Sequence, residues 1–447
     1  MKCLFVRIIV GITAALSAHA AWQAGVSAID ITPTESIWLA GYAARTKPSE
    51  SVRQPIYAKA LALRDDSGAT SVVVTLDLVG IRRKLAEAIA ERVAKELKIP
   101  RERLLFNASH THSSPVVGEP GSYAPIMGTK LDDQRVLIER YTVRLTGMLF
   151  DVIAKAVASL QPATLYFEQG YAGFAVNRRR VGHREYPGPV DHDVPVLTVK
   201  DVRGKITAIL FGYACHNTVL GDYTIHGDYA GYAQAALEKR NPGAVALFVQ
   251  GAGADSNPLP RRKPEHLERY GATLADAVEE VIGGRMKPVE GPLRAAIEFP
   301  EVRFEGPFGK ERWLLEARSR VERERQHGER MLAQMASAGK VEETHPYAVQ
   351  AWRFGTSITL IALAGELVVD YAVRFKSKYG PNTTWIAGYS NDVFGYVPSL
   401  RVWNEGGYEG GEAYLFSAYP GRLAGDVEDR ILDAVERVMA RVVGNVR

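Results

Sequence analysis

The sequence predicts a mixed α/β fold in which a β-sheet core is flanked by helices and the active site lies at strand ends. Two observations carry this prediction. Short apolar runs rich in β-branched residues alternate with longer stretches whose apolar residues recur at helical spacing. Hydrophobic residues make up 46% of the 447 residues, which is enough to bury a large core. Such alternation is typical of α/β architectures.

The expected elements cover most of the chain. We expect buried strands at residues 60–63, 71–78, 104–107, 194–199, 206–215, 245–250, 358–363 and 385–389. Helices are expected at 84–97, 134–160, 229–239, 266–281, 310–336, 368–379 and 421–442. A strand-like piece at 293–304 leads into a charged segment at 305–340, which we expect to form a helical excursion from the main domain.

The first twenty residues have the pattern of a secretory signal peptide. Lys2 and Arg7 precede a short apolar run, and the segment ends in Ala18-His19-Ala20, a small-x-small cleavage pattern. That run is shorter than the roughly 20 residues that span a bilayer, which argues against a membrane anchor. We therefore expect an exported protein, periplasmic or extracellular, with one domain over residues 21–447.

Charge and cysteine content narrow the functional classes. The net charge of +4 is small for this length, and arginine alternates with glutamate at 318–325, as on a solvated helix face. This pattern argues against nucleic-acid binding. Only Cys215 would remain after signal cleavage, so no intramolecular disulfide is expected.

His110 and His112 lie where an apolar strand gives way to polar residues. Alternation along an extended chain places both imidazoles on one side, as metal binding or acid/base chemistry requires. The alternative is structural, with both histidines capping a turn and bonded to the backbone.

A second strand end presents His216, followed by His226 and Asp228. Asp228 directly precedes the helix expected from Tyr229, so helix capping is the alternative to a role in the site. His226 is flanked by polar residues and is expected to be a loop histidine or a support for a ligand.

A third strand, at 245–250, leads into a glycine-rich turn that presents Asp255 and Ser256. Glycines such as Gly253 let the backbone approach a ligand and aim amides at an oxyanion. No lysine follows at the spacing of a phosphate loop, and the default role of a serine here is to form the turn.

Two further strands end near Glu366 and Tyr396. A carboxylate directly after an apolar strand costs stability unless it is paired or binds metal, although Glu366 could instead begin the next helix. Two histidines and a glutamate, with one position left open, form a typical ligand set for catalytic zinc.

Together these segments resemble the catalytic N-terminal domain of the neutral/alkaline non-lysosomal ceramidases, which are zinc amidases. The match begins at Gly25-Val26-Ser27-Ala28-Ile29-Asp30-Ile31-Thr32-Pro33 and includes Ala40-Gly41-Tyr42-Ala43, Asn177-Arg178 and Tyr408-Glu409-Gly410. The ordered co-occurrence of so many motifs is far more specific than any one of them.

The resemblance implies roles for individual residues. It implies one zinc ion per chain, with the ligands His110, His216, Glu366 and Tyr396. The catalytic residues it implies are His112, Arg178 and Ser256, the serine acting as a nucleophile or as a hydroxyl that orients the substrate. Substrate contacts are expected from Tyr408, Gly253 and Asp255. The sequence offers no support for a second, structural Mg²⁺ or Ca²⁺ ion.

The sequence departs from the family in the parts that would contact substrate. Ser256-Asn257-Pro258 stands for Ser-Pro-Asn, Ser114 for a glycine, and Arg179-Arg180 for a Ser-Pro pair. Family members generally carry a further β-rich C-terminal domain, which we expect this chain to lack. The implied zinc ligands are retained.

The implied function is zinc-dependent hydrolysis of an N-acyl linkage in a lipid-like substrate, such as conversion of an N-acylsphingosine to a sphingoid base and a fatty acid. One alternative is a metal-dependent esterase or other hydrolase that acts on small polar acyl substrates. Another is a secreted binding protein that keeps the fold without catalysis.

Overall fold

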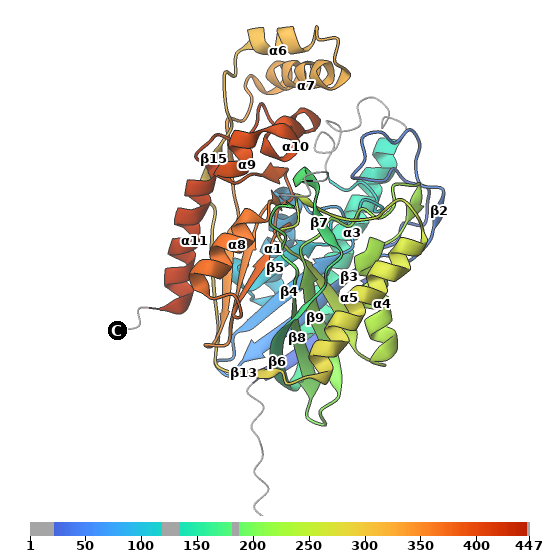
Figure 1. The fold of residues 1–447 in the computed structure, drawn as a ribbon, viewed down its shortest axis with the longest axis vertical. Helices are drawn as coiled ribbons and strands as arrows, with labels where there is room; N and C mark the ends of the chain where they lie inside the picture. Colours follow the sequence, from blue (N-terminus) through green and yellow to red (C-terminus); the bar gives the residue numbers. More distant parts are fainter. Residues whose placement is uncertain (1–21, 119–133, 181–186, 445–447) are drawn as a thin grey trace, which may run out of the picture.

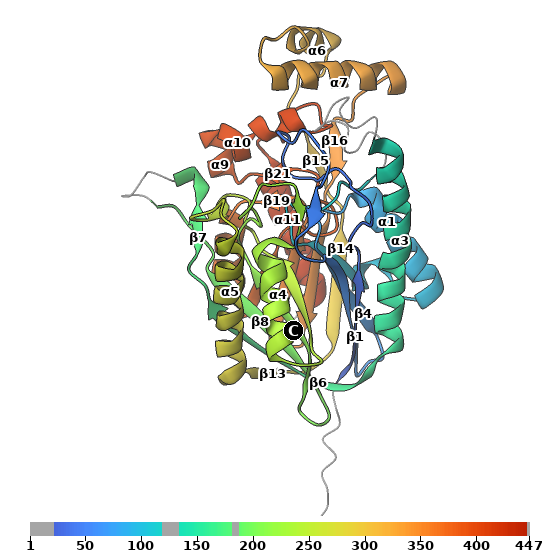
Figure 2. The same ribbon diagram turned by 90° about the vertical axis from the view of Figure 1, so that its right-hand side faces the viewer.

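The computed structural model describes residues 22–118, 134–180 and 187–444; the signal peptide expected at 1–20 lies outside them. Four layers stack in the order helices, large sheet, small sheet, helices (Figures 1 and 2). The predicted mixed α/β class, with a sheet core flanked by helices, is confirmed. No helix within the described ranges combines the length and apolarity needed to cross a bilayer.

The large sheet has nine strands in the order β11-β9-β8-β6-β1-β3-β4-β5, with β13 paired to β6. Their bounds are β11 Val245–Gln250, β9 Ile206–Tyr213, β8 Asp193–Asp201, β6 Gln161–Tyr171, β1 Trp22–Asp30, β3 Tyr57–Asp65, β4 Thr70–Leu76, β5 Leu104–Ala108 and β13 Lys287–Val289. Side chains alternate between its two faces: Val72 and Val74 of β4 pack toward helices, while Val73 packs toward the small sheet.

Four helices cover one face of the large sheet. They are α1 (Arg83–Leu97) and α3 (Arg135–Ala158) over the β1 to β5 half, and α4 (Asp228–Arg240) and α5 (Glu265–Gly283) over the β8, β9 and β11 half. The opposite face meets the small sheet, in the order β14 (Leu293–Glu298), β17 (Val349–Phe354), β18 (Ile358–Leu363) and β20 (Thr384–Ala387). Trp352 and Trp385 fill the layer between the sheets. Helices α8 (Asp370–Tyr379) and α11 (Val427–Val443) close the outer side.

Shorter elements build the upper end of the molecule in Figure 1. Two-stranded pairs join β2 (Ser51–Val52) to β10 (Thr224–Ile225), β7 (Ala175–Asn177) to β12 (Ser256–Pro258), β15 (Glu301–Arg303) to β16 (Thr344–Pro346), and β19 (Glu366–Leu367) to β21 (Tyr396–Val397). Helices α9 (Leu400–Glu405) and α10 (Gly407–Gly410) follow, and α6 (Lys310–Glu316) and α7 (Glu322–Ala338) project beyond them.

Two helices differ from the sequence predictions by more than two residues at a boundary. The single helix expected at 310–336 is two helices, because Ser319 Oγ accepts a hydrogen bond from Val321 N at 3.1 Å and donates one to Glu324 at 2.6 Å. Such local side-chain bonds compete with the helical ladder. The helix expected from 421 begins only at Val427, after Gly425.

The twist of the large sheet brings strand ends from opposite edges together. Neighbouring strands rotate by about 20–25° each, so eight strands accumulate roughly half a turn. The sheet also curls, so that the carboxyl ends of β5 and β11 meet although seven steps, five of them antiparallel, separate them in the sheet order. Asn107, which is fully buried in β5, joins them: its amide accepts from Gln250 N at 2.8 Å and donates to Gln250 O at 3.3 Å.

The same amide reaches the small sheet. Asn107 Nδ2 also lies 2.7 Å from Gly388 O and 3.2 Å from Ser390 Oγ, just beyond β20. One side chain thus fastens the ends of β5, β11 and β20, directly beneath the loops that carry the candidate site.

We expect Asn107→Ala to lower the free energy of unfolding by about 2–4 kcal/mol, because several buried polar groups lose their partner. Asn107→Asp should cost more, since its carboxylate would face the carbonyl oxygens of Gln250 and Gly388. Chemical denaturation measures both, with the exposed Asn382→Ala as control. Equal stability of Asn107→Ala and this control would contradict the role given to Asn107.

Candidate metal-binding and hydrolytic site

His110 and His216 are held so that each presents a bare Nε2 to the same point. His110 Nδ1 lies 2.6 Å from Val79 O, and His216 Nδ1 lies 2.8 Å from Gly253 O. A carbonyl oxygen only accepts, so each Nδ1 carries the proton and each Nε2 keeps its lone pair. Neutral imidazoles oriented in this way are ready to bind a metal ion.

Glu366 completes this arrangement. Its Oε2 lies 3.2 Å from His110 Nε2 and 3.3 Å from His216 Nε2, and it is buried without a hydrogen-bond donor. Two lone pairs and a carboxylate oxygen that converge without a proton between them fit a cation. The structure therefore brings together three of the ligands predicted from the sequence.

The fourth predicted ligand, Tyr396, faces Glu366 across a parallel strand pair. β19 and β21 align Glu366 with Tyr396 in register, and the Tyr396 hydroxyl lies 3.4 Å from His216 Nε2. Gly365 makes the preceding turn at φ +74°, where a Cβ would lie 2.9 Å from Gly395 O. The Gly-Glu order is thus a steric requirement for placing Glu366.

His112 lies beside these ligands. Its Nε2 is 3.1 Å from His110 Nε2, and each of the three histidines offers a ring nitrogen within 4.8 Å of the others. His112 Nδ1 is buried without a hydrogen-bond partner. The separate roles of His110 as a metal ligand and of His112 as an acid/base residue therefore stay predictions.

Tyr42 and Gly41 fix the His112 ring. The Tyr42 ring packs edge-on against it at a centroid distance of 4.6 Å, and Arg45 and Arg262 each lie 5.0 Å from the Tyr42 ring. Gly41, at φ +92°, lies so close that a Cβ would come within 2.4 Å of His112 Cγ. The Ala-Gly-Tyr-Ala segment is thus part of the site.

Burial sets the protonation states of the cluster. Burial, reinforced by Arg178, lowers the pKa of His216 to about 4, and burial with the neighbouring His110 holds the pKa of His112 well below its ordinary value. Neutral imidazoles and an ionised carboxylate are the forms that bind metal.

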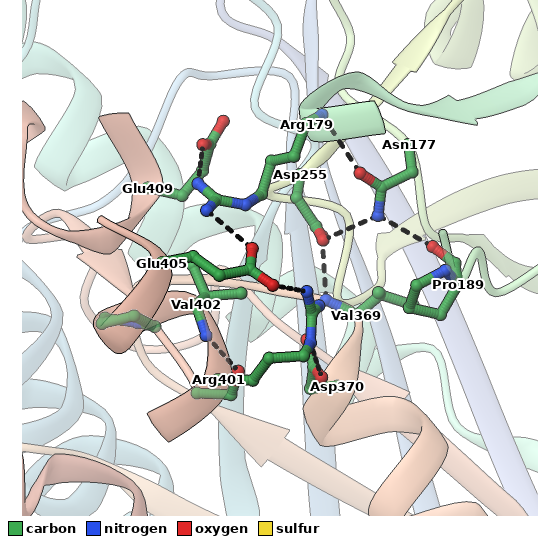
Figure 3. A network of polar contacts seen from close by, with 12 residues as sticks. Asn177, Arg179, Pro189, Asp255, Val369, Asp370, Arg401, Val402, Glu405 and Glu409 are labelled. Carbon is green, nitrogen blue, oxygen red and sulfur yellow. Dashed lines mark hydrogen bonds and ion pairs between the residues drawn. The ribbon is translucent and has the colours of Figure 1, made fainter. Parts of the chain in front are cut away.

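The glycine-rich turn after β11 contacts the cluster through His216. Gly253 donates its amide to Gly251 O at 2.9 Å, and its carbonyl orients His216, so its amide is not turned to the cavity. Asp255 accepts from Asn177 at 3.0 Å and from Val369 N at 2.9 Å, and burial raises its pKa to about 6 (Figure 3). The geometry therefore gives both residues structural contacts, and their expected substrate contacts stay predictions.

Ser256 differs from these neighbours. Its carbonyl accepts from His216 N at 3.0 Å, which places it beside a proposed ligand, and its hydroxyl is buried with no hydrogen-bond partner. The hydroxyls of Ser109 and Ser113 are likewise buried without a partner.

Arg178 connects the cluster to the α10 segment. It donates to Glu409 at 2.6 Å and to the Tyr396 hydroxyl at 3.0 Å. Arg179, where the family resemblance would place a serine, donates to the other Glu409 oxygen at 2.8 Å and to Glu405 at 3.0 Å (Figure 3). The arginine pair thus holds Glu409, and with it the neighbouring Tyr408, against the site.

A cavity of about 400 Å³ opens onto the cluster. Among its lining residues are His110, His112, Glu366, Tyr396 and Tyr408. Much of the remaining wall is apolar and comes from Val116, Val117, Phe304, Phe394, Phe416 and Leu423. A pocket with such a wall fits a largely apolar ligand that carries a polar reacting group.

Two residues near the second strand end lie outside the cavity. The Asp228 carboxylate accepts from the backbone amides of Val219, Leu220 and Tyr229, and burial raises its pKa to about 7. His226 Nδ1 accepts from Asp228 N at 3.1 Å. These contacts favour the structural interpretation of both residues.

Tyr389 was missed by the sequence reasoning. Its ring lies 4.5 Å from that of His110, and its buried hydroxyl has no partner. The sequence signal was weak, because Tyr389 ends an apolar strand and has the pattern of a core residue.

Comparison with known proteins agrees with the fold. Residues 22–258 match the family described as neutral/alkaline non-lysosomal ceramidase, N-terminal. A solved structure titled "Ceramidase complexed with C2" aligns with TM-score 0.72 and 17% identity, covering 94% of this chain and 75% of that one. The neutral ceramidase from Pseudomonas aeruginosa aligns with TM-score 0.71 and 19% identity over the same shares. A sequence comparison with curated proteins found no match.

The family match covers just over half of the chain and includes His110, His112, His216 and Ser256. This chain therefore belongs to the neutral/alkaline non-lysosomal ceramidase family and is a ceramidase-like hydrolase.

Proposed function

We propose that this protein is a zinc-dependent amidohydrolase that cleaves the N-acyl linkage of a lipid-like substrate, as in N-acylsphingosine. One observation carries the proposal: the Nε2 lone pairs of His110 and His216 converge on Glu366 Oε2 with no proton between them. Tyr396 would be the fourth ligand. Bound there, zinc would supply Lewis-acid polarisation of the acyl carbonyl.

The chain's own residues would carry out the remaining steps. Hydrolysis adds water across the amide and releases a carboxylic acid and an amine. His112, neutral and with a free buried Nδ1, would accept a proton from the attacking group and return it to the leaving nitrogen. Arg178 would place its guanidinium near the developing negative charge while Glu409 fixes its orientation.

Ser256 has two testable roles: attack on the carbonyl, or orientation of the substrate. Its hydroxyl without a partner supports either role. A trapped acyl-serine ester on Ser256, identified by peptide mass spectrometry, would assign attack; turnover retained in Ser256→Ala would exclude it.

The apolar cavity favours a lipid-like substrate over the small polar acyl compounds of the esterase alternative. Assays of N-acylsphingosines against short water-soluble amides and esters separate the two. For residues 1–20 we propose a cleaved export signal, and the N-terminus of the mature protein tests it.

We expect the purified protein to contain about one zinc ion per chain. His110→Ala should lose both metal and turnover, because it removes one of the converging lone pairs. His266→Ala, which changes a histidine on α5, should keep both. Full zinc content in His110→Ala, measured by elemental analysis, would overturn the metal assignment.

Gly41→Ala should lower kcat/KM by about 100-fold or more, because the added methyl group displaces His112, and general acid/base catalysis is typically worth at least that much. Zinc content should stay unchanged. Gly68→Ala is the matched control, since Gly68 also has a positive φ of +80° but has open space around it. A similar loss of activity in both variants would show that backbone strain, not His112, is responsible.

A further inference from the structure

The proposed chemistry leaves the α6–α7 hairpin, residues 310–338, without a role. Figures 1 and 2 show it projecting beyond α9 and α10. Its buried hydrophobic core is small and consists of Trp313 and Met331, together with Val341 just after α7. A unit with so little core depends on its contacts with the body for a fixed position.

These contacts fall largely on one short strip, residues 414–419. Four side chains of the hairpin donate hydrogen bonds to it. They are His327 to Tyr419 O at 2.8 Å, Gln334 to Ala418 O at 3.1 Å, Arg330 to Leu415 O, and Arg312 to the Tyr414 hydroxyl at 3.2 Å. Three of the four acceptors are backbone carbonyls, so the hairpin fixes the backbone of residues 414–419.

The same strip forms part of the cavity wall. Tyr414, Phe416, Ser417 and Tyr419 all line the cavity. The Tyr419 ring stacks on Phe304 at 4.7 Å, and Phe416 lies 6.2 Å from Tyr408, both of them further lining residues. The position of the hairpin therefore determines the position of an apolar part of the cavity wall.

His327 is the central contact. It is fully buried, its Nδ1 lies 2.6 Å from Glu316 Oε2, and its Nε2 lies 2.8 Å from Tyr419 O. Each ring nitrogen of His327 thus lies within hydrogen-bonding distance of an oxygen. Arg312 also binds Glu316, at 3.0 Å, so the histidine connects both helices of the hairpin to the strip.

We propose that the α6–α7 hairpin, held through His327, fixes the wall formed by residues 414–419 and thereby sets the length of acyl chain that the cavity accepts. The proposal rests on the proposed function, in which this cavity binds the acyl substrate. His327 is a positioning residue, because it contacts the wall and not the cluster.

The test compares His327→Ala with the unaltered full-length protein on N-acylsphingosines that carry short or long acyl chains. The KM for long chains should rise by about 3- to 10-fold, the equivalent of one buried hydrogen bond, while kcat and the short-chain KM stay unchanged. Gln326→Ala is the control: Gln326 donates a hydrogen bond to Glu322 of its own helix, and this variant should leave every value unchanged.

Gln334→Ala removes one bond to the same strip and keeps the test valid if His327→Ala does not fold. It should give a smaller shift in the same direction. Equal changes in KM at both chain lengths, or a change in kcat alone, would overturn the proposal.

A second measurement separates this inference from the proposed function. Displacement of a fluorescent fatty-acid probe by fatty acids of increasing length requires no turnover. If no acyl substrate is hydrolysed, the proposed function fails, yet a chain-length profile of displacement altered in His327→Ala would still support the hairpin's role. An identical profile in folded variants would overturn it.

Discussion

The candidate site depends on the amide of Asn107. It is fully buried and hydrogen-bonds to Gln250 of β11 and to Gly388 and Ser390 beyond β20, so it joins strand ends from both sheets. Hydrophobic packing between the sheets is not directional and would permit small shifts. Hydrogen bonds have a defined length and angle, so they remove that freedom at the strand ends below the candidate site. The distances between the side chains of the site tolerate shifts of only a few tenths of an ångström.

The positions of the histidines follow from this junction. His110 lies three residues after Asn107, and its Nδ1 binds Val79 O, in the loop that follows β4; His216 binds Gly253 O, in the turn after β11. The carbonyls of Val79 and Gly253 therefore select the histidine tautomers. Both carbonyls lie in loops that follow strands of the large sheet, and Asn107 maintains the relative position of the strand ends. A metal site built in this way needs no ion to define its ring orientations.

The sequence predicted the helices and strands better than the contacts between them. His110, His216 and Glu366 could be proposed from the sequence because each follows an apolar run that ends abruptly in polar residues. Such an ending can be recognised without a structure. The roles of Asn107 and Tyr389 depend on a sheet twist that joins distant segments, and an asparagine or tyrosine beside an apolar run gives no such signal. The contacts of Gly253 and Asp255 with the backbone and with Asn177 were likewise not predicted, and their expected substrate contacts stay predictions.

The electron pairs that converge in the cluster oppose folding. Glu366 Oε2 lies 3.2 Å from His110 Nε2 and 3.3 Å from His216 Nε2, and it is buried without a hydrogen-bond donor. Packing and the hydrogen bonds beneath must offset this repulsion in the metal-free protein. A cation at the centre converts repulsion into attraction, so metal affinity and the free energy of unfolding are linked. The arrangement that makes the site costly to fold is thus also the source of its affinity for metal.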